Sequence, residues 1–182
     1  ALESHRVIAD IALNFRLATA RAVERGYRRI GFLAAPSRNE RRRRIYNDQI
    51  RLRRWHLENE VGPQPATLWL GPADGAEALE RWLATERPDV VIADHVDRCA
   101  ALQALGTALP KGLGLIGLVN RTATPPNEPL SQVNVRRVTV FRHALTILHD
   151  AILREEYGTP AIPVRMLIPG GWHEGRTLPS LA

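Results

Sequence analysis

The segment "RRIGFLAAPSRNERRRRIYNDQIRLRRW", from Arg28 to Trp55, joins a strand pattern of the buried type to a helix rich in arginine. Six apolar or small residues, Ile30 to Ala35, precede the four consecutive arginines Arg41 to Arg44. A helix is expected from about Glu40 to Glu60, ended by "VGPQP". Because this helix lies between two strand signals and not at a terminus, we interpret the arginines as a solvated helix face rather than as a nucleic-acid-binding arm.

Three more apolar runs follow along the chain. They are "ATLWL" (66–70), "PDVVIAD" (88–94) and "GLGLIGLV" (112–119), and the last two show the weak alternation of strands buried on both faces. Helices are expected between them, from Gly75 to Thr85 and from Asp97 to Leu105. This order is typical of the α/β class and predicts a parallel sheet with right-handed crossovers. Ligands of such sheets bind beyond the carboxyl ends of the strands.

The segments before and after this series add further elements. A strand over 6–10 precedes a helix from Ala12 to Arg25. After the proline-rich stretch 120–129, we expect the short strand "LSQVNV", a long helix from Arg136 to Glu156 and a late strand over 164–172. The long helix carries an apolar stripe at helical spacing. The stripe consists of Val138, Phe141, Leu145, Leu148 and Ile152.

Composition excludes several classes of protein. The chain has 182 residues, of which 45% are hydrophobic and 24% charged, as in an ordinary globular protein. No apolar run approaches the about 20 residues that cross a membrane, and the first residues lack a secretory pattern. The single cysteine, Cys99, cannot form an internal disulfide, and the histidines form no metal cluster. We therefore expect cytoplasmic residence, no membrane contact, no metal and no cofactor.

The net charge of +6 would ordinarily favour an anionic partner. Here nearly all positive charge is arginine, since Lys111 is the only lysine, and such a skew is what a GC-rich coding bias produces. We therefore give the charge little weight as a sign of nucleic-acid binding.

Five pieces of the chain, in order, resemble the LacI/GalR-type bacterial transcription regulators. "GYRRIGFLAAPSRNERRRR" is similar to their "GHRRIAFI…R", and "RPDVVIADHVDRCAALQAL" to "PDAIFAANDLMALGALRAL". "LPKGLGLIGLVN" is similar to "VPEDVSVVGFDD", and "EPLSQVNVRRVTVFRHALTILHDAI" to "PPLTTVRQPFEEMGRLAVELLLELI". "PVRMLIPGGWHEGRTL" resembles the closing "…LPPELVVRESTA". The resemblance covers almost the whole chain.

The resemblance implies a periplasmic-binding-protein-like α/β fold, with two subdomains joined by crossing strands. It places residues 1–28 and 131–160 in a remnant of the N-terminal subdomain, and residues 29–130 and 161–182 in a complete C-terminal subdomain. The family's DNA-reading helix-turn-helix and the opening of its N-terminal subdomain have no counterpart here. The expectation is an effector-binding fragment that forms a homodimer and reaches operator DNA only through the missing N-terminal domain.

Asp94 is the strongest candidate for a ligand-binding residue. It ends a buried strand at the ligand edge and falls where the family places an Asn, with His95 next to it. A carboxylate at this position also suits the N-cap of the next helix, which is the structural alternative. Arg44 is the nearest match to the family's effector-binding arginine, although Asn47 and Asp48 replace the Gly and aromatic residue that follow it in the family. A surface role for Arg44 is the competing interpretation.

Two further residues complete the predicted site. In "GLVN", Val119 and Asn120 replace the two aspartates of the family's "GFDD", so Asn120 is the remaining polar group there; Asn also favours turns. Trp69 is a candidate for stacking on a sugar ring, and it is at least as well suited to the core. Trp82 fits the core face of a helix and is left out of the site.

The sequence leaves three functions open. The first is an effector-binding and dimerisation domain for a small polar ligand, a sugar or a derivative of one. The second is a small α/β enzyme with a strand-end site, although no Ser-His-Asp order, G-x-S-x-G motif or glycine-rich phosphate loop is present. The third is a nucleic-acid binder that acts through the arginine helix, for which we expect only weak and non-specific binding.

Overall fold

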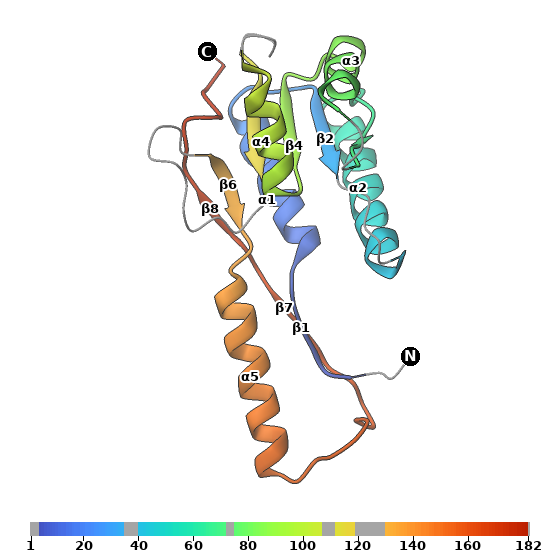
Figure 1. Ribbon diagram of the computed structural model, residues 1–182, viewed down its shortest axis with the longest axis vertical. Coiled ribbons are helices and arrows are strands. Elements are labelled where there is room, and N and C mark those ends of the chain that lie inside the picture. The colour runs from blue at the N-terminus through green and yellow to red at the C-terminus, as the bar shows by residue number, and fades with distance from the viewer. Residues whose placement is uncertain (1–3, 35–39, 72–74, 107–111, 119–129, 182) are drawn as a thin grey trace.

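The computed structural model describes residues 4–34, 40–71, 75–106, 112–118 and 130–181 (Figure 1). Helices and strands alternate through most of the chain. The elements are β1 (Arg6–Ala9), α1 (Ile11–Glu24), β2 (Ile30–Ala34), α2 (Glu40–Glu60), β3 (Leu68–Trp69), α3 (Ala76–Glu86), β4 (Val90–Ala93), α4 (Val96–Ala104), β5 (Gly114–Gly117), β6 (Ser131–Asn134), α5 (Arg137–Leu153), β7 (Arg165–Ile168) and β8 (Gly171–His173).

The larger of two units is a six-stranded sheet in the order β3-β2-β4-β5-β6-β8. Its strands pair in parallel from β3 to β6, and β8 joins β6 antiparallel. The central strands β2 and β4 are buried along their whole length, as expected for strands covered on both faces. This confirms the predicted α/β class with a parallel sheet flanked by helices.

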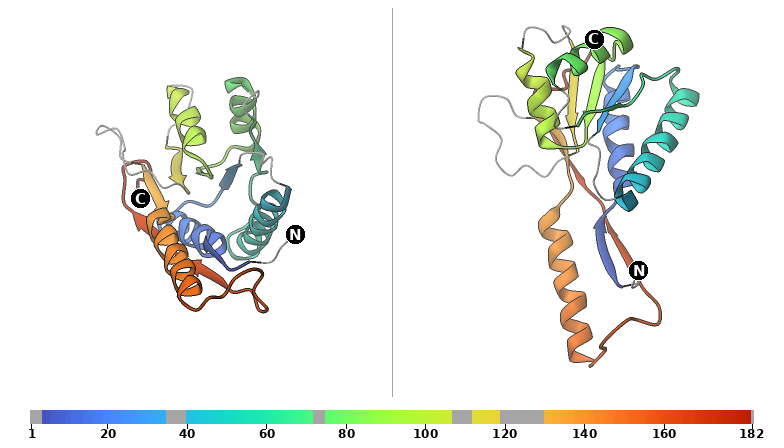
Figure 2. Two further views of the ribbon diagram at one scale, coloured as in Figure 1. Left: turned by 60° about the horizontal axis from the view of Figure 1, so that its bottom comes forward. Right: turned by 45° about the vertical axis from the view of Figure 1, so that its right-hand side comes forward.

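Two helices cover each face of this sheet. On one face α1 and α2 bury Phe15, Ala18, Ile50 and Leu57 against strand residues such as Phe32. On the other face lie α3 and α4 (Figure 2, left), which bury a second cluster that includes Cys99. Trp82 lies in this second cluster, as its place on the helix predicted.

Glycines permit close packing between these layers. A Cβ at Gly31 in β2 would lie 2.7 Å from the ring of Trp82, and one at Gly114 in β5 would lie 2.8 Å from the ring of Tyr27. The Tyr27 hydroxyl donates to the carbonyl of Pro179 at 2.8 Å, and the backbone N–H of Leu181 donates to the carbonyl of Arg25. These contacts fasten the C-terminal segment to the end of α1.

The smaller unit consists of β1, β7 and α5 and extends away from the six-stranded sheet (Figure 1). β1 and β7 form a parallel ribbon in which Arg6 is opposite Arg165 and Ala9 is opposite Ile168. None of the residues of α5 is buried, and its predicted apolar stripe is exposed. The smaller unit therefore has a helix face and ribbon edges that are not covered within the described residues.

The structure differs from the expected division of the chain at several elements. Helix α1, which the resemblance placed in the N-terminal remnant, packs on the six-stranded sheet, and β6 is a strand of that sheet. Conversely, β7 pairs with β1 outside it. The expected single strand over 164–172 is two strands, because the chain changes partners at Pro169 and Gly170.

Candidate functional site

The carboxyl ends of β2, β3, β4 and β5 lie along one edge of the sheet, because these strands are parallel. This edge faces the smaller unit (Figure 1). Among the described residues the chain passes between the two units three times, at β1–α1, at β6–α5 and at β7–β8. A ligand at the strand ends would therefore lie next to the segments that join the units.

Asp94 lies at this edge, directly after β4. Its backbone N–H donates to the carbonyl of Leu33 at 3.1 Å, which holds the residue against the end of β2, and its side chain is half-buried. The N-cap of α4 is His95, whose Nδ1 accepts from the backbone N–H of Asp97 at 3.3 Å. The structure thus gives the capping role to His95, which is exposed, and not to Asp94.

Tyr46 is a residue of this edge that the sequence did not single out. It extends from α2, is largely buried, and meets Phe15 edge-on at 5.6 Å between ring centroids. Burial raises the pKa of the Tyr46 hydroxyl, and the negative charge of Asp94 raises it further. The phenol is therefore a neutral hydrogen-bonding group near the carboxylate. No motif pointed to it, because Tyr46 and Asp94 belong to different elements.

The other predicted site residues are distributed differently. Arg44 lies on the same helix as Tyr46, two residues before it, and is exposed. Trp69 is half-buried and packs against the core on the α2 face of the sheet, where it lines a groove with Trp55. The structure therefore places Trp69 with α2 and not beside Asp94. Asn120 and Val119 lie outside the described residues.

The junction of the two units is packed around Asn14 of α1. Asn14 is 3% exposed, and its Oδ1 accepts from the backbone N–H of Gly170 at 2.8 Å. On β6, the side chain of Asn134 accepts from the backbone N–H of Arg136, which has a left-handed conformation with φ 51° at the start of α5. Asn14 thereby ties the first connection between the units to the third.

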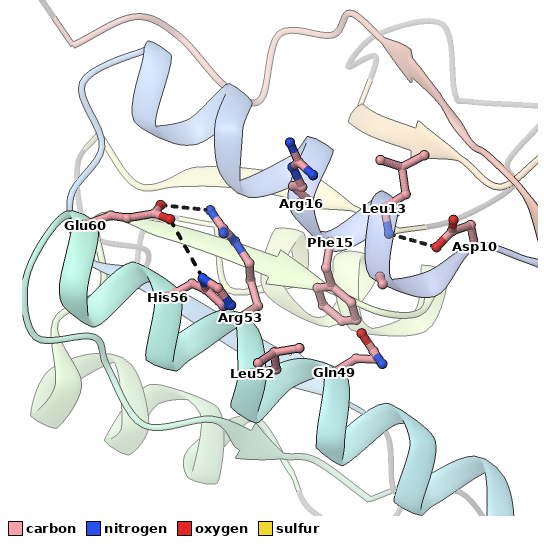
Figure 3. Close-up of a pocket in the computed structure, with 10 residues that line it drawn as sticks. Asp10, Leu13, Phe15, Arg16, Gln49, Leu52, Arg53, His56 and Glu60 are labelled. Carbon is pink, nitrogen blue, oxygen red and sulfur yellow. Dashed lines mark hydrogen bonds and ion pairs between the residues drawn. The ribbon is translucent and has the colours of Figure 1, made fainter.

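A cavity of about 510 Å³ lies between α1 and α2 (Figure 3). Phe15, Leu13 and Leu52 supply its apolar surface. Its polar side chains largely engage one another or the backbone. Asp10 accepts from the N–H of Leu13 at 2.9 Å, Arg53 donates to Thr19 at 2.7 Å and lies 3.5 Å from Glu60, and His56 lies 4.0 Å from Glu60.

Other kinds of site find no support in the described residues. Within those ranges no three His, Cys, Asp or Glu side chains gather as metal ligands would. In the same ranges no helix has the length and apolar character needed to cross a membrane.

The fold defines a class of protein: a helix-covered parallel sheet connected to a second unit by three chain crossings is a periplasmic-binding-protein-like domain. The periplasmic binding protein-like domain family matches residues 19–178, and the chain belongs to it. A comparison with curated proteins found no match.

Solved structures of transcription regulators share this fold. The xylose-binding transcription activator xylR superposes with a TM-score of 0.75 at 23% identity, over 96% of this chain and 48% of that one. The LacI family transcriptional regulator from Enterococcus faecium with bound ribose gives a TM-score of 0.65 at 16% identity, over 96% of this chain and 65% of that one. The transcriptional regulator CelR in its cellobiose complex gives a TM-score of 0.67 at 22% identity, over 96% of this chain and 54% of that one. This chain therefore spans about half to two thirds of the length of these relatives.

Tyr46 is expected to make the fold less stable as the pH rises above about 10. The folded chain keeps a phenolic proton that the unfolded chain releases, because the pKa of Tyr46 is raised only in the folded state. Stability from this group is fully present below about pH 10 and falls above it by up to about 1.4 kcal/mol per pH unit. Urea unfolding of the wild type and of Tyr46→Phe, from about pH 9 to about 11, measures this slope.

Tyr46→Phe keeps the ring but should lose the part of the pH dependence of the free energy of unfolding that comes from the hydroxyl. Tyr157→Phe is the matched control, because Tyr157 is 77% exposed and its removal should leave the slope as in the wild type. Equal slopes for the wild type and Tyr46→Phe would contradict the assignment.

Proposed function

We propose that the chain is the effector-binding domain of a LacI-type transcription regulator and that it binds a small hydroxylated ligand, a sugar or a sugar derivative. The observation that carries the proposal is the proximity of Asp94 and Tyr46 at the carboxyl edge of the sheet. A half-buried carboxylate accepts hydrogen bonds from hydroxyl groups, and a neutral phenol can donate and accept them. The similar regulators with bound ribose and cellobiose support a sugar as the ligand class.

Binding at this edge would act on the junction between the units. A ligand that contacts both the strand ends and the smaller unit favours one angle between them, by its difference in affinity for the two arrangements. The Asn14–Gly170 contact lies where that angle is set. We propose that β1, β7 and α5 belong to a second subdomain, and that a regulator would transmit their movement to its DNA-reading domain.

An enzyme with a strand-end site is the second candidate. Asp94 and Tyr46 could serve as an acid–base pair, but the described residues hold no group of three His, Cys, Asp or Glu side chains that would suggest a larger catalytic cluster. The third candidate, nucleic-acid binding through α2, has the arginines of that helix in its favour, but Arg53 and Arg54 are engaged by Glu60 and Glu58. We therefore favour a binding domain without catalytic activity.

A thermal-shift panel of xylose, ribose and cellobiose tests the proposal. A ligand that binds only the folded state raises the melting temperature in a saturable way. At a ligand concentration a hundred times its Kd, the free energy of unfolding rises by about 2.7 kcal/mol. Stabilisation without chemical change of the sugar, checked by chromatography, supports a binding domain. Turnover would favour the enzyme, and salt-sensitive binding of duplex DNA by this chain would favour the third candidate.

The chain is expected to form a homodimer through the smaller unit. The stripe on α5 exposes Phe141 by 65% and Leu148 by 57%, and a surface of this kind promotes association. Light scattering should give a dimer mass that falls toward the monomer on dilution. Phe141→Glu should shift the equilibrium to the monomer. Leu52→Glu, at a residue of α2 that is 53% exposed, is the control and should leave the mass unchanged. A monomer mass at every concentration would contradict the prediction.

A further inference from the structure

Strand β3 is an end strand of the six-stranded sheet, and its outer side is unpaired within the described part of the chain. On its inner side it pairs with β2, with Leu68 opposite Leu33, and the N–H of Leu70 donates to the carbonyl of Ala34 at 2.9 Å. Successive residues of a strand direct their backbone groups to opposite sides. The N–H and C=O groups of Trp69 and the C=O group of Thr67, the residue before β3, therefore point away from β2, where they can pair with an added strand.

A groove of about 390 Å³ runs beside this edge, between β3 and α2. Trp69 of β3 and Thr67 just before it line one side of the groove, and Arg51, Arg54 and Trp55 line the other side from the helix. Trp55 is 60% exposed, which is unusual for so large an apolar side chain, and Trp69 is half-buried beside it. The unpaired backbone groups and the exposed aromatic surface thus occur at one place.

The charge of the groove is positive. Arg54 is held by the carbonyl of Gln64 at 3.2 Å and by Glu58 at 3.3 Å, so this cation has a fixed position and one balancing charge. Arg51 is exposed and forms no ion pair within the described ranges. Two guanidinium groups and one carboxylate leave one net positive charge on the wall that a new strand would face.

We propose that this edge is a docking site for an extended acidic peptide segment of a partner protein, which adds to the sheet as a strand beside β3. The backbone of the segment would pair with the outward groups of Thr67 and Trp69. Its alternate side chains would meet the groove, with acidic groups at Arg51 and Arg54 and apolar groups at Trp55 and Trp69. The site lies on the α2 face and is separate from the edge that holds Asp94, so it does not depend on the proposed effector function.

The free edge, and not the arginines alone, decides between a peptide and a nucleic acid. A nucleic acid needs cations and stacking aromatics but makes no use of unpaired backbone groups at the spacing of a strand. An added peptide strand uses both the backbone groups and the side chains that line the groove. The two alternatives predict different responses when backbone pairing is blocked.

The experiment titrates this chain with the synthetic peptide acetyl-Val-Glu-Val-Glu-Val-Glu-amide and follows tryptophan fluorescence and calorimetry. Saturable binding is expected. Arg51→Glu should weaken it by about tenfold or more, because this exposed cation becomes a repelling anion in the groove. Thr67→Pro removes the N–H just before β3, which β2 does not use, and it should weaken the pairing of an added strand to a similar extent.

Two controls separate strand addition from attraction by charge. Arg16→Glu changes the charge of the chain equally but lies on the exposed surface of α1, and should bind as the wild type does. The same peptide with N-methylated backbone amides keeps its charge but cannot pair, and should not bind. Circular dichroism melts check that each variant is folded. If Arg51→Glu does not fold, Arg51→Gln replaces it in the titration.

The proposal is overturned if the N-methylated peptide binds as tightly as the parent, or if Arg16→Glu weakens binding as much as Arg51→Glu does. Absence of binding at millimolar peptide also overturns it. Tighter binding of a single-stranded oligonucleotide than of the peptide, lost in Arg51→Glu but kept in Thr67→Pro, would assign the groove to nucleic acid instead. None of these outcomes bears on sugar binding at the Asp94 edge.

Discussion

Replacing Gly170 by alanine should lower the free energy of unfolding by about 3 kcal/mol, since overpacking and a lost buried hydrogen bond each cost on this scale. An added Cβ would clash with Oδ1 of Asn14, and it would lie 2.7 Å from Cγ1 of Val133 and 2.9 Å from the carbonyl oxygen of Asn134. These three neighbours come from α1 and β6, so relief of the clash must move a helix or a strand. Such a movement would also break the Asn14–Gly170 hydrogen bond and leave a buried amide without its partner.

Chemical denaturation measures this loss, and Gly75→Ala is its control. Gly75 precedes α3 and has an ordinary φ of −74°, and a Cβ added to it would meet no atom within 4 Å beyond its chain neighbours. Its replacement should cost no more than about 1 kcal/mol, the scale of a change at a helix N-cap. Similar free energies of unfolding for the two variants would contradict the prediction. They would show that the residues around Gly170 accommodate an added Cβ at little cost.

Asp94→Ala should weaken the binding of whichever sugar stabilises the chain by about 1.5–3 kcal/mol, the usual scale for a hydrogen bond to a charged group. In terms of Kd this is about a tenfold to 150-fold increase. The free energy of unfolding should change much less, by about 1 kcal/mol. The reason is that the capping of α4 is performed by His95, so removal of the Asp94 carboxylate leaves the helix start in place.

Calorimetric titration with that sugar gives the affinity, and Asp97→Asn is the matched control. Asp97 is three residues further on, carries the same charge, and its side chain is 76% exposed. Its replacement should leave the affinity unchanged, whereas Arg44→Ala tests the second family position in the same assay. Unchanged affinity in Asp94→Ala together with a large drop in melting temperature would make Asp94 a structural residue and move the search for the effector site elsewhere.

Much of the local structure follows from the order of residues alone. The arginine-rich helix spans Glu40–Glu60 as its pattern predicted, and the apolar runs around Phe32 and Ile92 form central strands. These predictions succeed because periodicity and punctuation by Gly and Pro report the local environment of each element. The place of Asp94 at the carboxyl edge of the sheet also follows, because a residue directly after a buried parallel strand lies at that edge.

Partners distant in the chain could not be derived in this way. The run that forms β1 has the same apolar character as the central strands, yet it pairs with β7, which lies near the other end of the chain. The proximity of Tyr46 to Asp94, the turn of Trp69 toward α2 and the Asn14–Gly170 contact depend on how separate elements pack. A side chain's sequence neighbours fix its helix or strand and the face it lies on. Which residues pack against that face is decided only by the tertiary structure, because it depends on the burial and hydrogen bonding of the whole fold.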